Sequence, residues 1–234
     1  MDMRRWYRRM RREAALQSRR RRPASVVAVT AAAPLELTTQ AFDFGLTWTV
    51  KETMARSSHA LVDDGRVWLI DPVDDPAVME EVAALGEPVG VLQLLDRHDR
   101  DGAAIAQRLG VPLRRLPASV PDAPFRVVRV IERPGWHELA LWWPDRATLV
   151  VSEALGTCSY FAVGHGRVGV HPMLRLLPPK APFAALTPEH LLVGHGPGLH
   201  TGDVTLEIED ALADSRSDIP RLLLRLPGLL RSGI

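Results

Sequence analysis

Short strand-like runs separated by turn residues set the pattern of the first half of the chain. Residues 35–38 and 46–50 alternate apolar with polar or β-branched side chains, which is typical of strands. The segment 60–70 holds two apolar runs around Asp64-Gly65, and this arrangement predicts a hairpin with a tight turn. Asp71-Pro72 then ends the second strand of the hairpin.

Helical periodicity follows this hairpin. Two helices are predicted, over 76–85 and 102–109, and each is followed by a glycine that suits a helix C-terminus. The continuous apolar run 89–95 between them predicts a strand buried on both faces, and 111–113 predicts a short further strand. This strand–helix order implies a sheet with crossover helices.

The second half predicts a further group of strands and a helical end. The strands are expected at 125–131, 137–143, 148–152, 160–163 and 191–193. The helices are expected at 204–212 and 218–230. The last helix should be broken at Pro227-Gly228, and we interpret it as a packed terminal helix rather than a membrane anchor. Two β-rich halves with external helices fit an αββα sandwich of two mixed β-sheets as well as any other α/β fold.

Composition predicts a soluble globular protein. The chain has 234 residues, 46% of them hydrophobic and 24% charged, and no apolar run approaches the roughly 20 residues of a membrane-spanning helix. Its single cysteine, Cys158, cannot form an internal disulfide, which fits a reducing compartment, and we expect a cytoplasmic location. We interpret Cys158 as a small buried residue rather than a nucleophile.

Charge divides the chain into a basic start and a mildly acidic body. Residues 1–22 contain ten arginines against two acidic residues, a net charge of +8, and the remainder carries −7. We expect residues 1–33 to be a disordered or non-native extension and residues 34–234 to form one domain. The alternatives are a targeting segment, or a tail that contacts nucleic acid or anionic lipid through phosphates. We favour the extension, because nothing downstream is typical of a nucleic-acid-binding protein.

Five short segments that carry turn or charged residues follow one another over roughly 35–202. They are Ala60–Pro72 with its Ile-Asp-Pro end, Asp96-Arg97-His98-Asp99-Arg100-Asp101, Pro134–Trp143, Val150–Gly156, and Leu191–Pro197 with its Gly-His-Gly turn. In this order and spacing they resemble the metallo-β-lactamase-fold hydrolases. The resemblance implies the αββα sandwich and a metal site built from an altered His-x-His-x-Asp-His signature.

Under this resemblance, the metal ligands fall on positions that are only partly preserved. His98 and His195 keep both place and chemistry, and the two glycines around His195 permit a sharp turn that projects its ring. The candidate metal ligands are therefore Asp96, His98, Asp101, His137, Glu153 and His195. Arg100 stands where the signature has its aspartate, and a guanidinium cannot bind a cation. We interpret the other histidines as structural, namely His59, His165, His171, His190 and His200.

Two kinds of function remain open on this basis. The first is a metal-dependent hydrolase of an ester, thioester or phosphoester, with zinc, manganese or iron as the divalent cofactor. The second is a catalytically inactive binding or interaction module with no metal. In such a module, Arg97 or Arg100 would form ion pairs with Asp96, Asp99 and Asp101 where the metal site would otherwise be. The substrate or ligand would be a small molecule of unknown identity, and neither the catalytic residues nor the oligomeric state follow from the sequence.

Overall fold

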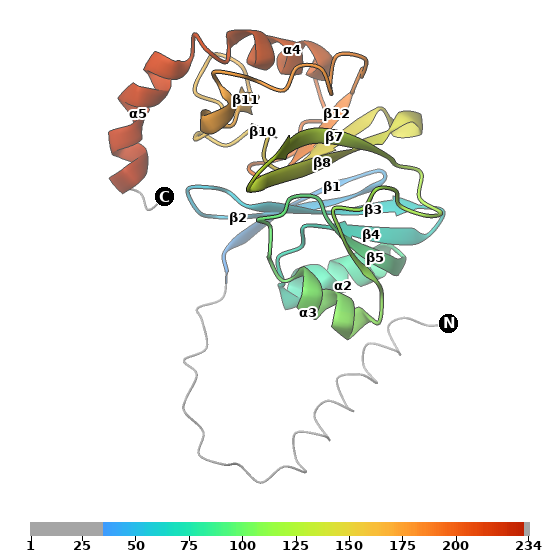
Figure 1. Cartoon of the computed structure of the whole chain (residues 1–234). Coiled ribbons are helices and arrows are strands. Elements are labelled where there is room, and N and C mark those ends of the chain that lie inside the picture. Colours follow the sequence, from blue (N-terminus) through green and yellow to red (C-terminus); the bar gives the residue numbers. More distant parts are fainter. Residues whose placement is uncertain (1–34, 232–234) are drawn as a thin grey trace.

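The computed structural model describes residues 35–231, and within them two β-sheets lie face to face (Figure 1). The expected basic extension at 1–33 lies outside the described residues. One sheet has six strands in the order β1-β2-β3-β4-β5-β6. Its strands are β1 (Leu37–Phe42), β2 (Gly45–Val50), β3 (Ser57–Asp63), β4 (Arg66–Ile70), β5 (Glu87–Gln93) and β6 (Leu113–Arg115).

The six-stranded sheet is mixed. Its first four strands are antiparallel, and the hairpin between β3 and β4 turns at Asp64-Gly65, as predicted. The strands β4, β5 and β6 are parallel, because the helices α2 (Pro76–Leu85) and α3 (Gly102–Leu109) form the crossovers between them. Both helices have the predicted bounds.

The second sheet has four strands in the order β12-β9-β8-β7 and is also mixed. β12 is parallel to β9, whereas β9, β8 and β7 are antiparallel. These strands are β7 (Arg126–Arg133), β8 (Trp136–Trp143), β9 (Thr148–Val151) and β12 (His190–Val193). The remaining elements are the short pair β10 (Leu155–Gly156) and β11 (Gly169–Val170), the 3-10 turns η1 (Pro144–Arg146) and η2 (Pro172–Leu174), and the helices α4 (Val204–Asp214) and α5 (Ile219–Arg231).

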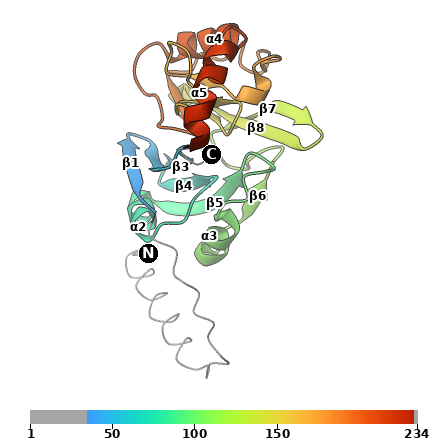
Figure 2. The same ribbon diagram turned by 90° about the vertical axis from the view of Figure 1, so that its left-hand side faces the viewer.

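Three apolar layers hold these elements together. Trp68, Phe125 and Trp143 pack edge to face between the two sheets. The outer face of the six-stranded sheet is covered by α2 and α3, and that of the four-stranded sheet by α4 (Figure 2). The order helix, sheet, sheet, helix confirms the predicted αββα sandwich. Trp142, next to Trp143 on β8, packs on the opposite layer, as alternation along a strand requires.

Two element predictions are wrong. The segment 160–163 forms turns rather than a strand, because Phe161 is fully buried between β10 and β11. There it lies so close to Gly156 and Gly169 that neither glycine could carry a side chain. The helix α5 continues through Pro227 instead of breaking there. Pro227 has no amide to donate to the Leu223 carbonyl, and since Leu223 is exposed, water can donate to that carbonyl instead.

One smaller shift concerns β6, which begins at Leu113 rather than Val111. The Val111 amide closes the end of α3 by donating to the Ala106 carbonyl, and it is therefore not available to a strand. No helix in the described part of the chain combines the length and apolar character needed to cross a membrane.

His59 joins the two sheets at the edge where the candidate site lies. From β3, its Nε2 donates to the Val193 carbonyl of β12 at 3.0 Å, while Nδ1 accepts from the Thr47 hydroxyl at 2.8 Å. Burial lowers the pKa of His59 to about 3, so the ring is neutral in the folded protein near neutral pH. The prediction that His59 is structural agrees with these contacts.

His59 should make stability fall as the pH falls. Its folded pKa of about 3 lies below the ordinary 6.5, so the unfolded chain binds the extra proton between these two values. Unfolding free energy, measured by urea denaturation, should therefore drop by about 1.4 kcal/mol per pH unit below pH 6 relative to a His59→Gln chain. Parallel pH profiles for the two chains would contradict this account.

Candidate metal centre

Three strand ends from both sheets meet at one edge of the sandwich. His98 follows β5, Glu153 follows β9, and His195 follows β12. β9 and β12 are parallel neighbours, so their carboxyl ends lie side by side. One ligand atom from each of the three side chains lies within 4.8 Å of the other two. This His98–Glu153–His195 cluster is the only such group of three or more found among residues 35–231.

Asp71 orients His98 from the end of β4. Its Oδ2 accepts from His98 Nδ1 at 2.9 Å and from the Ser152 hydroxyl at 2.7 Å, while Oδ1 accepts from the Leu94 amide at 3.1 Å. Burial would raise the pKa of Asp71, but the neighbouring His98 and Arg100 outweigh burial and hold that pKa below its ordinary value. Since Asp71 is ionised, His98 Nδ1 is the donor in this contact, which leaves Nε2 as the ring nitrogen that could reach a metal.

His195 is oriented in the same way by a backbone group. Its Nδ1 donates to the Met54 carbonyl at 2.9 Å, and its ring stacks on Phe161 with centroids 5.4 Å apart. Its Nε2 is buried and has no hydrogen-bond partner among the described residues. Burial, aided by Arg100, lowers the pKa of His195 to about 3, so the imidazole is neutral. A neutral imidazole with a free, buried lone pair is the form in which histidine binds metals.

Both glycines of the Gly194-His195-Gly196 turn are required by close packing. A Cβ at Gly194 would lie 2.2 Å from the Ser152 carbonyl oxygen and 3.0 Å from His98 Cε1. Gly196 has a φ of +108°, a conformation that favours glycine, and a Cβ there would lie 2.2 Å from Thr157 Oγ1. Gly196 thus supplies the turn expected from the Gly-His-Gly pattern, whereas Gly194 is required by its close contact with the residue that follows β9.

Glu153 is fixed from two sides. Glu138, fully buried on β8, accepts from the Glu153 amide at 2.7 Å and from the Ala154 amide at 2.8 Å. Burial raises the pKa of Glu138 to about 7 despite these donors. The Glu153 carboxylate pairs with the Arg97 guanidinium, which stacks over Trp136 at 4.1 Å. Its other oxygen, Oε1, lies 3.9 Å from His195 Nε2.

Arg100 donates hydrogen bonds to backbone carbonyls around the site and does not pair with acidic residues of its own loop. Its Nη1 donates to the carbonyls of Ser57 and Asp71 at 2.5 and 3.0 Å, and its Nη2 donates to the Gly194 carbonyl at 3.0 Å. Burial lowers the pKa of Arg100, although Asp71 opposes this. The guanidinium thus ties three strand ends together through their backbone.

The ion-pair network expected from the sequence is wrong in its pairing. Arg97 pairs with Glu153, and Arg100 contacts backbone carbonyls. Asp99, with a side chain 82% exposed, lies 3.9 Å from Arg115. The arginines of the signature segment therefore reach across to other strand ends, because those ends carry the buried acceptors that need a donor.

Three of the six candidate ligands lie together, and the other three have separate contacts. Asp96 accepts from the amide and from Nδ1 of His137, at 2.9 and 3.2 Å, and the His137 side chain is about half exposed. Asp101 accepts from the Asp74 amide at 2.9 Å. Asp96, His137 and Asp101 are thus not members of the His98–Glu153–His195 cluster. Their assignment as ligands stays a sequence prediction.

The sequence pattern does not identify two residues that hold the site in place. The sequence pattern marks Asp71 only as the end of a strand and assigns no role to Glu138. A signal for Asp71 existed, since a carboxylate directly after the buried run of β4 must find hydrogen-bond donors at the sheet edge. Glu138 lies in a strand whose other buried residues are apolar, which makes it a comparable signal.

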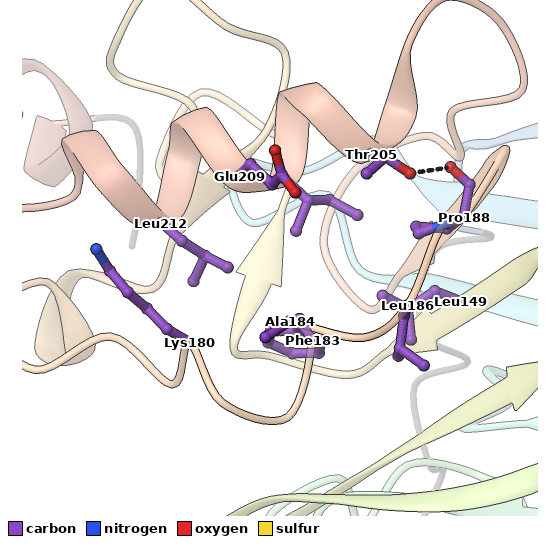
Figure 3. A pocket seen from close by; sticks show the side chains of 10 residues that line it. Leu149, Lys180, Phe183, Ala184, Leu186, Pro188, Thr205, Glu209 and Leu212 are labelled. Atoms are coloured by element: carbon purple, nitrogen blue, oxygen red, sulfur yellow. Dashed lines mark hydrogen bonds between the residues drawn. The ribbon is translucent and has the colours of Figure 1, made fainter.

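A separate apolar hollow of about 210 Å³ lies between α4 and the loop before β12 (Figure 3). Phe183, Ile208 and Leu212 line it, and Lys180 and Glu209 are its two charged residues. It contains no member of the His98–Glu153–His195 cluster. The hollow and the cluster are therefore distinct features of the molecule.

Comparison of the structure with solved structures identifies the fold. Similar structures include a diflavin flavoprotein A 5 fragment from Nostoc sp. PCC 7120, with a TM-score of 0.56 and 12% identity over 79% of this chain and 98% of that one. The DIM-1 metallo-beta-lactamase exposed to ceftazidime has a TM-score of 0.50 and 10% identity, over 79% and 98% of the two chains. TMB-1 has a TM-score of 0.50 and 12% identity, over 79% and 99%.

These likenesses show that the chain has the metallo-β-lactamase fold, as the sequence resemblance implied. At 10–12% identity they show the fold alone. No protein-family model and no curated protein sequence matches the chain.

Replacing Asp71 tests its role in holding the site. Asp71→Ala leaves His98 Nδ1, the Ser152 hydroxyl and the Leu94 amide without their buried acceptor, and we expect a loss of about 3 kcal/mol or more in unfolding free energy. Asp71 also has a φ of +42°, so Asp71→Asn, which tolerates that conformation, should lose less. The exposed Asp99→Ala should change stability by about 0.5 kcal/mol at most. Equal losses for Asp71→Ala and Asp99→Ala would refute this role.

Proposed function

We propose that the protein is a metal-dependent hydrolase that binds one divalent cation between His98, Glu153 and His195. The observation that supports this most is the buried His195 Nε2, which has no partner among the described residues and lies 3.9 Å from a carboxylate oxygen. A lone pair left without a donor in a buried site costs free energy unless a cation or proton shares it. The neutral ring leaves this lone pair free for a metal ion, whose charge the Glu153 carboxylate would offset.

The donor set also fits a metal. Both histidines anchor Nδ1 elsewhere, on Asp71 and on the Met54 carbonyl, and both therefore offer Nε2 to the same place. Such outer contacts are usual for metal-binding histidines, because they fix the tautomer and the ring orientation. Two imidazoles and one carboxylate suit zinc, manganese or ferrous iron, the metals expected from the sequence.

A bound divalent cation supplies a Lewis acid that polarises an ester, thioester or phosphoester and makes water a better nucleophile at neutral pH. The chain's own residues position that chemistry. Glu138 fixes the backbone of Glu153, and Asp71 and Arg100 hold the strand ends that carry the histidines. Arg97, 42% exposed beside the cluster, is the cationic group best placed to meet an anionic part of a substrate.

A second candidate function is a non-catalytic binding module without a metal. The Arg97–Glu153 ion pair favours it, because it already neutralises the one carboxylate of the cluster. Arg100 adds a second positive charge near the histidines and works against a cation. In the hydrolase, the Glu153 carboxylate would leave Arg97 and bind the metal. In the binding module, the Arg97–Glu153 ion pair would persist.

Metal content separates the two functions. Protein purified without chelator and dialysed against Zn²⁺, Mn²⁺ or Fe²⁺ should hold about one ion per chain by elemental analysis. Thermal unfolding should shift upward as the ion is added, since binding at about 100 times Kd stabilises the folded state by about 2.7 kcal/mol. His98→Ala/His195→Ala should lose both the ion and the shift. Metal-dependent turnover of a panel of esters, thioesters and phosphoesters should disappear with it.

His137→Ala is the matched control, because His137 is an exposed histidine near the cluster but outside it. It should keep the bound ion and the thermal shift. If no divalent ion binds the wild-type chain, or if His137→Ala loses the ion as completely as the double variant, the three-residue site is refuted.

Arg97 should compete with the metal for Glu153. Removing its charge by Arg97→Gln frees the carboxylate, and metal affinity measured by calorimetry should rise roughly threefold to tenfold, a modest gain because the guanidinium is 42% exposed. Arg129→Gln, which removes a 71% exposed arginine on β7, should leave the affinity unchanged. An unchanged or weaker affinity in Arg97→Gln would show that the ion pair does not oppose metal binding.

A further inference from the structure

The outer face of α5 is apolar and uncovered. Leu223 and Leu224 are 59% and 83% exposed, whereas Leu222 beside them is buried against the body at 7%. Pro220 and Pro227, also exposed, complete a stripe with Leu223 and Leu224 at the i, i+3, i+4, i+7 spacing of one helix face. The sequence pattern favoured a packed terminal helix, but packing in the structure involves the opposite side of α5.

A second exposed apolar segment adjoins this helix. Met173, Leu176 and Leu177, around η2, are 74%, 66% and 64% exposed. The Leu176 carbonyl accepts from Arg216 at 2.9 Å, three residues before α5 begins. Residues 173–177 and the outer face of α5 together form what we call the α5 corner. It contains five of the seven large hydrophobic side chains that are exposed among the described residues.

The charges of α5 are all of one sign. The helix contains Arg221, Arg225 and Arg231, and no acidic residue follows Asp218 in the sequence. Arg221 pairs with Asp218 at 2.7 Å, while Arg225 makes one long contact of 3.4 Å with the Ala162 carbonyl. The chain from residue 23 onward carries a net −7, so this basic helix is a local departure from an acidic body.

These charges decide what can cover the α5 corner. In a symmetric dimer the same surface meets itself, so the α5 arginines of the two copies would approach one another and repel. An anionic lipid surface has the complementary charge, and leucines beside arginines on one amphipathic helix are typical of segments that lie in a bilayer interface. A 13-residue helix spans about 20 Å, which is too short to cross a bilayer but long enough to lie along one.

We propose that the α5 corner is a docking surface for an anionic membrane. Leu223 and Leu224, together with the exposed side chains of Met173, Leu176 and Leu177, insert into the interfacial layer. Arg221 and Arg225 contact lipid phosphates. This places the protein on a lipid surface through its C-terminal helix, independently of its arginine-rich N-terminal segment and of any metal.

Vesicle sedimentation with the full chain tests the proposal. Phosphatidylcholine vesicles with and without phosphatidylglycerol are compared, using wild type, Leu223→Ser/Leu224→Ser and Leu206→Ser. Leu206 is the matched control, since it is 49% exposed but lies on α4 beside acidic Glu207. We expect wild type to bind the anionic vesicles, the double variant to bind roughly tenfold more weakly or worse, and Leu206→Ser to bind as wild type does.

The substituted leucines are exposed, so all three chains should share one thermal midpoint, which checks that any loss is not unfolding. Equal binding by the double variant and wild type would overturn the proposal and assign any lipid binding to other parts of the chain. A wild-type dimer in sedimentation velocity that becomes a monomer in the double variant, without vesicle binding, would overturn it in favour of a second copy. Arg225→Gln should weaken binding to anionic vesicles alone, and equal loss on neutral vesicles would refute the role of charge.

Discussion

The buried carboxylate of Asp71 is the interaction on which the candidate site depends. It accepts three hydrogen bonds from the loop after β5 and the end of β9, and it faces the Arg100 guanidinium, which in turn contacts the ends of β3, β4 and β12. An ionised group in a sheet interior is tolerated only when its lone pairs are filled and its charge is balanced. The three donors fill the lone pairs of Asp71, and Arg100 helps to balance its charge. The hydrogen bonds of the two side chains thereby fix His98, Ser152 and Gly194 in one place.

This arrangement changes how Arg100 is understood. From the sequence, a guanidinium at a signature position argued only against metal binding. In the structure its hydrogen bonds go to backbone carbonyls beneath the cluster, and its charge helps to keep His195 neutral. Arg97 is the arginine that reaches Glu153 directly. The structural role of Arg100 and the competing role of Arg97 are therefore separate, and only Arg97 has to yield for a cation to bind Glu153.

Much of the fold followed from local patterns. Helices α2 and α3 and the β3–β4 hairpin were predicted to the residue or nearly so, because glycines and Asp-Gly mark their ends directly. The strand expected at 160–163 failed because the burial of Phe161 against two glycines depends on tertiary packing that periodicity does not record. For the site, the sequence indicated His98, Glu153 and His195 through family order. It missed Asp71 and Glu138, whose importance lies in contacts with segments 23 and 15 residues away.

The central claim is that two histidines and a glutamate from three strand ends hold one metal ion. Crystals soaked in Mn²⁺ or Zn²⁺, with diffraction data collected at the absorption edge of that metal, test it most directly. The account predicts a single anomalous peak within bonding distance of His98 Nε2, His195 Nε2 and the Glu153 carboxylate, with Arg97 displaced from Glu153. Absence of a peak there, with Arg97 still paired to Glu153, would contradict it.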